Sequence, residues 1–379
     1  MMPRHRRLIL GLLLQRVLLL VVALLALFAF LDATRVFAQV RPDGYSWLQA
    51  LGQIGLRMPR HLYDGLPLAV LLGAVMALSH LAQTSQFTVL RAAGLAPRDL
   101  VRLLAGTGVA LAALTWLWGD QVATRTDQAA QTQQDLRLGR RAATDAPPVW
   151  LRERWPAPGS PSSEPATLRF ISARVRGSGE LADVVIQAFD DQGRLRSTWR
   201  AAGAQIPPTA SGHWTLMDAR RTDFPPAGDA PTAPPLAEIR QARMDWPTQL
   251  DTALVLSALS PSYQMSSARL LEYGRHLRDA GQSDQPYSVA LWNRIFYALG
   301  CGVLLLLALP FAYAPPRRNA SGMALLAGTL LGVAYVLANS VAAQIGQIYQ
   351  WNALASTAWP TLLALAGATL WLRRTWRLR

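Results

Sequence analysis

Apolar segments long enough to cross a bilayer constrain this chain more than any other feature. A membrane-spanning helix needs about 20 predominantly apolar residues, and such segments occur on both sides of a long polar insert. We predict spans at Leu8–Phe30, Leu66–Ala82, Leu100–Trp118, Leu291–Phe311, Met323–Ala343 and Leu354–Leu372. Because six crossings return the chain to its starting side, both termini are expected on the same face of the membrane.

The arginines indicate which face that is. With the termini in the cytoplasm, the inner segments carry many arginines, as the positive-inside rule expects, and the connection Gln344–Trp351 carries no charge. The insert then lies on the outer side of this membrane, opposite the cytoplasm. The first outer segment departs from the rule, because it also contains four arginines. These are Arg35, Arg41, Arg57 and Arg60.

Composition excludes several functions. The net charge of +14 and the pI near 11.1 would indicate nucleic-acid binding in a soluble protein, but the inner membrane anchors explain much of this excess. All 37 basic residues are arginine. A Walker A phosphate loop needs its lysine, so the chain is not a conventional P-loop ATPase. Cys301 is the single cysteine, which excludes a disulfide framework and a thiolate metal site.

The insert has the alternation of β-strands. In Arg194–Ala201, apolar or small residues alternate with polar ones at the period of two that one buried face requires. Further short strands are predicted at Thr167–Val175, Leu181–Phe189, His213–Asp223 and Glu238–Trp246. Proline-rich stretches at Pro147–Pro165 and Pro225–Pro235 are predicted as turns. Antiparallel strands of this kind pack as a sandwich or jelly roll whose edge can accept a partner strand, although a plain spacer domain is the alternative.

A helix is predicted between the strands and the fourth span. Ser266 or Ser267 can cap it, and Gly281 ends it. The predicted organisation is therefore a first membrane region at 1–118, an all-β insert at 119–287 with a terminal connecting helix at 266–281, and a second membrane region at 288–379.

The link between spans two and three predicts a short helix at 85–94. Ser85 is a suitable N-cap, Gly94 supplies a left-handed C-terminal position, and Pro97 prevents continuation. Phe87 and Leu90 share one face, and Arg91 follows Phe87 by one turn. This segment is either a compact loop or a coupling helix that docks on a cytoplasmic partner.

Several segments resemble one known family. Leu71–Gly94, LLGAVMALSHLAQTSQFTVLRAAG, resembles the signature of the LptF/LptG lipopolysaccharide export permeases. The loop sequence within it, LAQTSQFTVLRAAG, is more similar to the G-type than to the F-type members. Leu168–Leu195 resembles the periplasmic jelly roll of that family, Ala290–Phe296 (ALWNRIF) its entry into the fourth span, and Ala308–Phe311 (ALPF) a point within it. The resemblance covers nearly the whole chain and implies six transmembrane helices with an inserted all-β periplasmic jelly-roll domain.

The resemblance also implies a function. The chain would be a non-catalytic permease subunit of an ABC transporter in the bacterial inner membrane, which extracts lipopolysaccharide and passes it to a periplasmic bridge. The implied partners are a cytoplasmic LptB-type ATPase homodimer, an LptF-type permease and a single-span LptC-type subunit. ATP and Mg would bind the ATPase, and this chain would carry no cofactor. The coupling residues would be Ser85, Gln86, Phe87, Val89, Leu90, Arg91 and Gly94.

The four outer arginines fit this function. Guanidinium groups make charge-assisted contacts with phosphates such as those of lipid A, which predicts substrate binding by Arg35, Arg41, Arg57 and Arg60. Anchoring to lipid headgroups is the alternative for these residues. Gln86 stands where the family typically has a glutamate, so an ion pair with the ATPase would be replaced by a neutral hydrogen bond.

Two other functions fit the same architecture. A membrane-anchored envelope enzyme would need a nucleophile, a base or a metal cluster, yet the five histidines are scattered and neither HExxH nor GxSxG is present. A permease for another lipid or lipoprotein would share the whole architecture, and only the bound cargo would separate it from a lipopolysaccharide permease.

Overall fold

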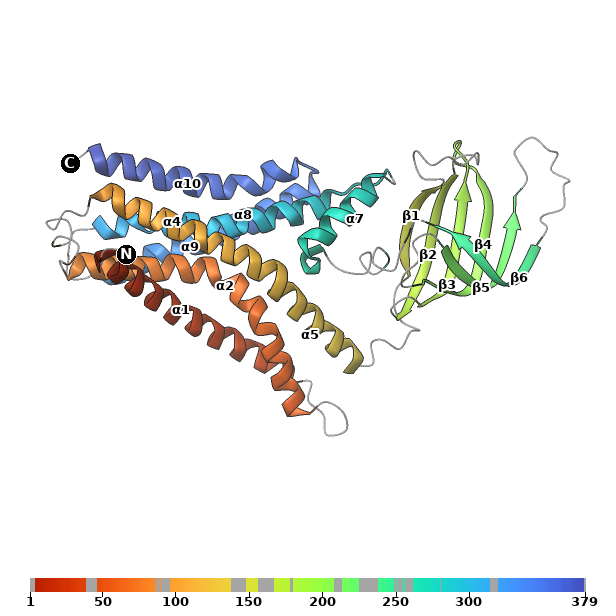
Figure 1. The fold of residues 1–379 in the computed structure, drawn as a ribbon, viewed down its shortest axis with the longest axis horizontal. Helices are drawn as coiled ribbons and strands as arrows, with labels where there is room; N and C mark the ends of the chain where they lie inside the picture. Colours follow the sequence, from red (N-terminus) through yellow and green to blue (C-terminus); the bar gives the residue numbers. More distant parts are fainter. Residues whose placement is uncertain are drawn as a thin grey trace. The chain divides into compact units, whose positions relative to one another are not determined.

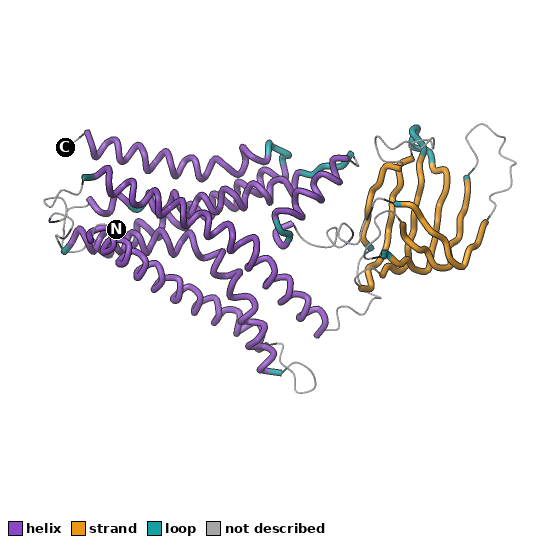
Figure 2. Tube along the Cα trace, viewed as in Figure 1, coloured by secondary structure: helices purple, strands orange, loops and turns teal. Residues whose placement is uncertain are grey.

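The computed structural model consists of a helical unit and a β unit, coloured by secondary structure in Figure 2. The helical unit contains Met1–Gln133 and Gln285–Arg379, and the β unit contains Gln134–Asp284. The structure describes residues 4–38, 46–84, 86, 89, 96–137, 148–155, 167–177, 180–207, 213–224, 238–248, 250, 255, 262–279, 281–313 and 320–377.

Within the described residues, six helices have the length and hydropathy needed to cross a membrane, as predicted. Both chain termini lie at the same end of the helical unit (Figure 1). The helices are α1 (Arg4–Phe37), α2 (Trp47–Gln83), α4 (Pro97–Leu117), α8 (Gln285–Leu307), α9 (Ala320–Ile348) and α10 (Ala353–Arg377).

Helix α2 supplies much of the core of the helical unit. Leu71 and Leu78 of α2 are buried together with Leu304 of α8. Helices α4 and α8 cross where two glycines meet, since a Cβ on Gly302 would lie 2.6 Å from the carbonyl oxygen of Gly108. Small residues at such crossings let backbones approach closely, which favours association of helices in lipid.

Two of the helices continue well past their apolar spans. α2 begins at Trp47, where Ser46 and Gln49 form a capping box. α4 leads through a π-helix, η1 (Trp118–Ala123), into α5 (Thr124–Arg137). Hydropathy alone does not find these extensions because they are polar, but local capping and continuous backbone hydrogen bonding keep them helical.

The β unit is built on one antiparallel sheet whose six described strands follow chain order as a meander (Figure 1). The five predicted strands are confirmed, with small changes at their ends. The strands are β1 (Val149–Trp155), β2 (Thr167–Gly177), β3 (Glu180–Phe189), β4 (Leu195–Gln205), β5 (His213–Asp223) and β6 (Glu238–Pro247).

β1 corrects the sequence-based prediction, which treated Pro147–Pro165 as a turn region. Val149–Trp155 instead pairs in register with β2, from Val149 opposite Ala173 to Trp155 opposite Thr167. The prolines on either side of this segment favoured a turn prediction. A short strand can nevertheless form when an apolar side chain anchors its inner face, and in β1 Leu151 lies in the core of the β unit.

The core of the β unit lies on one face of the sheet. Trp214, Ile171 and Ile186 are fully buried there, and the Trp214 indole donates a hydrogen bond to the Leu250 carbonyl at 2.8 Å. Within the same unit, α7 (Ser267–Asp279) follows Ser266, whose hydroxyl accepts from the backbone N–H of Arg269.

Candidate functional site

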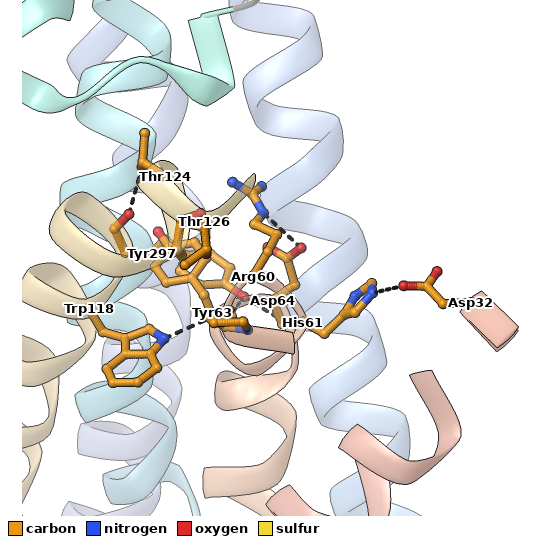
Figure 3. A network of polar contacts seen from close by, with 12 residues as sticks. Asp32, Arg60, His61, Tyr63, Asp64, Trp118, Thr124, Thr126 and Tyr297 are labelled. Atoms are coloured by element: carbon orange, nitrogen blue, oxygen red, sulfur yellow. Dashed lines mark hydrogen bonds and ion pairs between the residues drawn. The ribbon is translucent and has the colours of Figure 1, made fainter. Parts of the chain in front are cut away.

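Polar and charged residues gather where α5 leaves the helical unit and α8 re-enters it. We call this region the insert end of the helical unit. α1 ends and α2 begins at the same end, because successive helices alternate in direction. Figure 3 shows the contacts made there by α1, α2, the π-helix and α8.

A buried ion pair joins the π-helix to α8. Nη1 of Arg294 lies 2.6 Å from Oδ1 of Asp120, and the two side chains are 8% and 9% exposed. Nearby, the Trp118 indole donates a hydrogen bond to the Pro59 carbonyl at 3.1 Å, which ties the π-helix to α2. Charged groups inside apolar helices are costly and mark functional positions by default, and single π-helical turns occur frequently at functional sites.

A tyrosine from α8 completes the hydrogen bonding of α2. Pro67 has no N–H, so the Tyr63 carbonyl four residues earlier lacks its usual helical donor. The hydroxyl of Tyr297 donates toward this oxygen at 3.1 Å and toward the Asp64 carbonyl at 2.8 Å. Gly119 provides the room for Tyr63, since a Cβ at that glycine would lie 2.3 Å from the Tyr63 ring. The local sequence thus fixes α2, α8 and the π-helix against one another.

A second ion pair on α2 is accessible to solvent. Nε of Arg60 lies 3.0 Å from Oδ2 of Asp64, with the side chains 26% and 45% exposed, and the two point toward each other in Figure 3. The Arg60 guanidinium also lies 5.6 Å from the centre of the Tyr63 ring. Asp127 of α5 interacts electrostatically with both Arg57 and Arg60. The partly exposed guanidinium of Arg60 gives this cluster a group that can contact an anion.

A histidine–aspartate pair connects α1 and α2. Nε2 of His61 lies 2.7 Å from Oδ2 of Asp32, and the His61 ring stacks on Phe28 with centroids 5.0 Å apart. Asp32 is buried. α1 is otherwise largely exposed, so this polar contact positions its outer half against α2.

The structure brings together only some of the predicted substrate residues. Arg57 and Arg60 lie on adjacent turns of α2 and share Asp127 as an electrostatic partner. Arg35 lies in the last turn of α1 with an exposed side chain. Arg41 lies outside the described residues.

Most of the predicted coupling helix also falls outside the described part of the chain. This applies to Ser85, Phe87, Leu90, Arg91 and Gly94. Gln86 and Val89 are described; both are helical and exposed, and Val89 is 66% exposed as a whole residue. The role of this segment in coupling stays a prediction.

The buried pair and the acidic partners of the arginines were not predicted from the sequence. Two opposite charges inside or beside apolar spans, Asp120 and Arg294, were a usable signal, because such charges pair with one another in membranes. Asp64 was also detectable, since it follows Arg60 by four residues on one helix. Asp127 could not be placed, because α5 was not expected to be a helix of the bundle.

The chemistry of the insert end is that of binding. Within the described residues, no group of three or more histidine, cysteine, aspartate or glutamate side chains could hold a metal ion. The exposed groups are guanidinium and carboxylate, and guanidinium provides the geometry for phosphate recognition.

Within the described residues, six helices suited to span a membrane and a β unit inserted after the third define a polytopic membrane protein with one large extramembrane domain. A family model described as "Lipopolysaccharide export system permease LptF/LptG" matches residues 7–374, and the chain therefore belongs to this family. It is a permease component of the lipopolysaccharide export system and an inner-membrane protein.

Named relatives agree with the family assignment. The chain is 26% identical over 88% of its length to the lipopolysaccharide export system permease protein LptG of Escherichia coli (strain K12), covering 86% of that protein. It is 25% identical over 90% of its length to the protein of the same name from Haemophilus influenzae, covering 90% of that protein.

Proposed function

We propose that this chain is the G-type half of a permease that extracts lipopolysaccharide from the inner membrane and passes it to a periplasmic bridge. Family membership and the similarity to proteins named LptG support this proposal. The observation that carries the substrate side of the proposal is the solvent-accessible cluster of Arg57 and Arg60 on α2, at the end of the helices from which the β unit departs.

Guanidinium groups suit this substrate for a physical reason. Hydrogen bonds in which donor or acceptor is ionised contribute about 1.5–3 kcal/mol each, more than neutral ones. Arg60 is held over the Tyr63 ring, so less side-chain freedom is lost when it binds a phosphate. Arg35, exposed at the end of α1, would add a further contact. The acyl chains would need only apolar helix faces.

The orientation is part of the proposal. With both termini in the cytoplasm, the insert end faces the periplasm and the β unit lies in the periplasm. The distribution of arginine supports this orientation, since the segments near the chain termini are rich in arginine and Gln344–Trp351 carries no charge.

ATP hydrolysis would take place on another chain. Without lysine, this protein has no conventional Walker A loop. We therefore propose an LptB-type ATPase homodimer as its motor, with ATP and Mg bound there, and an LptF-type permease and a single-span LptC-type subunit as its membrane partners. The segment around Gln86 and Val89 would dock on the ATPase, and both residues are exposed in keeping with this.

The test is affinity purification of the full chain from its native membrane in mild detergent, followed by mass spectrometry of the proteins and lipids that accompany it. We expect a P-loop ATPase, a second six-span permease and lipopolysaccharide. Replacement of Phe87 and Leu90 with aspartate should release the ATPase while the second permease stays bound. Recovery of the chain without an ATPase, or with a lipid that lacks phosphate, would refute the proposal.

A further inference from the structure

The cluster of mixed charge on α2 and α5 has a formal charge of zero. It consists of two arginines, Arg57 and Arg60, and two aspartates, Asp64 and Asp127. A site selected only to hold an anionic lipid would gain affinity from arginine and lose affinity from each aspartate, because like charges repel. Binding of an anionic lipid alone therefore does not account for the two aspartates.

The geometry of the Arg60–Asp64 pair indicates a role for Asp64. Its Nε–Oδ2 distance is 3.0 Å, within the range of a direct hydrogen bond, yet both side chains are partly exposed. Exposed pairs contribute only about 0.2–1 kcal/mol, so a competing anion can displace the carboxylate at small cost. The buried Asp120–Arg294 pair, at 8–9% exposure, has no such access.

The position of Asp64 is also fixed in advance. Its backbone carbonyl accepts a hydrogen bond from the Tyr297 hydroxyl at 2.8 Å, and it follows Arg60 by one helical turn. The backbone of Asp64 is therefore held one helical turn from Arg60, so its carboxylate stays within reach of the guanidinium when an anion displaces it. From the other side, Asp127 of α5 contributes a second negative charge that acts on Arg60.

We propose that the Asp64 carboxylate is an internal competitor of the lipid phosphate for the Arg60 guanidinium, with Asp127 adding to it from α5. This inference rests on the proposed function, because it assumes a phosphate-bearing lipid at Arg60. Asp64 re-pairs with Arg60 when the lipid leaves, so no guanidinium is left without a counter-ion and the cargo is held loosely enough to be passed on. Asp64 limits affinity and thereby speeds release.

The experiment uses the complete purified transporter in nanodiscs and measures the dissociation constant and the ATP-driven release rate of lipopolysaccharide. We expect Asp64→Asn to bind lipopolysaccharide about twofold to fivefold more tightly and to release it correspondingly more slowly, which is the range of an exposed ion pair. Asp64→Glu should behave like the native protein. Asp99→Asn is the matched control, because Asp99 forms an exposed pair with Arg102 on α4, away from the insert end.

Three readouts separate competition from a merely structural role. The gain in affinity should disappear in an Arg60→Gln background, it should shrink as salt is raised, and it should be absent for dephosphorylated lipid A. If Asp64→Asn binds lipopolysaccharide equally or more weakly while Arg60→Gln weakens binding, the inference fails and the proposed function stands. If the native transporter binds no lipopolysaccharide, both fail.

Discussion

The two units of this protein each bury an arginine beside a carboxylate, and they stabilise the charges differently. In the helical unit, Arg294 contacts Asp120 directly at 2.6 Å. In the β unit, Arg169 of β2 lies opposite Glu153 of β1 in register, yet the closest charged atoms are 3.9 Å apart. Burial does not explain the difference, because all four side chains are at most 9% exposed.

In the β unit the two charged side chains contact other groups, most of them at or next to the end of β6. Arg169 donates to the Pro247 carbonyl at 2.8 Å and lies within 4.6 Å of the centres of the Trp155 and Trp246 rings. Glu153 accepts a hydrogen bond from the Thr248 hydroxyl at 2.8 Å. A chain that leaves a sheet has backbone carbonyls to offer, whereas helices in lipid use theirs internally. We therefore expect buried charges between helices to depend more on each other.

The largest expected effect follows from breaking the pair in the helical unit. Asp120→Ala removes the carboxylate that lies 2.6 Å from Nη1 of the buried Arg294, and breaking a buried ion pair by removing one partner costs about 3–5 kcal/mol. We expect loss of the monodisperse folded protein when thermal unfolding in detergent is followed by fluorescence-detected size exclusion. The double variant Asp120→Leu with Arg294→Met removes both charges and should recover most of this stability. Equal damage from the single and double variants would contradict the comparison.

Breaking the corresponding pair in the β unit should cost less. Arg169→Met preserves an apolar side chain between the two tryptophans, and Glu153 keeps its hydrogen bond with Thr248. We expect a loss of about 1–3 kcal/mol, typical of an unsatisfied buried polar group, measured by tryptophan fluorescence during denaturant unfolding of the full chain. Arg200→Met on the exposed side of β4 is the matched control and should change little. A loss as large as that of Asp120→Ala would remove the distinction between the two units.

A smaller effect is expected where Gly119 of the π-helix packs against the Tyr63 ring of α2. A Cβ at Gly119 would lie 2.3 Å from the Tyr63 ring, so Gly119→Ala should displace that ring and destabilise the protein by about 1–3 kcal/mol. Gly106→Ala on α4 has nothing within 4 Å of the added atom and should be neutral or slightly stabilising. The measurement is the melting temperature of each variant, compared by thermal unfolding. Similar melting temperatures would show that Tyr63 does not need the space at Gly119.

The smallest expected effect concerns the exposed turn between β3 and β4. The carboxylate of Asp190 accepts backbone hydrogen bonds from Arg194 and Gln192 and contacts the Arg194 guanidinium, which lowers the pKa of Asp190. A lowered pKa means that the stabilisation is present above the usual aspartate value and is lost as pH falls through the lowered one. The protection of the Arg194 amide against hydrogen exchange, measured relative to its intrinsic exchange rate at each pH, should therefore fall only in acid. Asp190→Asn should remove this acid dependence, whereas Asp191→Asn beside it should keep it.

The sequence predicted elements whose pattern is strong over their whole length. The six spans follow from hydropathy, and five strands follow from alternation such as that of Ser197, Trp199 and Ala201, which are all buried. β1 was missed because prolines flank a single short strand. The polar extensions, which are the start of α2 and the continuation of α4 into α5, were missed because their helical state depends on caps and on continuation of the preceding helix, which hydropathy does not measure.

The candidate site was predictable only in part. Arg57 and Arg60 stood out because they break the positive-inside rule, and the structure places them near each other with Asp127. Asp120 and Arg294 are 174 positions apart in the sequence, so only the packing of the π-helix against α8 reveals that they pair. The role of Gly119 depends on the Tyr63 ring opposite it, which no local pattern reports.

The central claim is that the arginines of the insert end bind the phosphates of the cargo. The most direct measurement is ATP-driven transfer of lipopolysaccharide from proteoliposomes containing the complete transporter, comparing Arg57→Gln/Arg60→Gln with Arg373→Gln/Arg374→Gln. Both variants lose two exposed or partly exposed arginines, but Arg373 and Arg374 lie near the end of α10. We predict that the first variant reduces transfer about tenfold or more, as expected for loss of charge-assisted hydrogen bonds, while the second transfers normally. Equal transfer by the two variants, with both complexes fully assembled, would contradict the account.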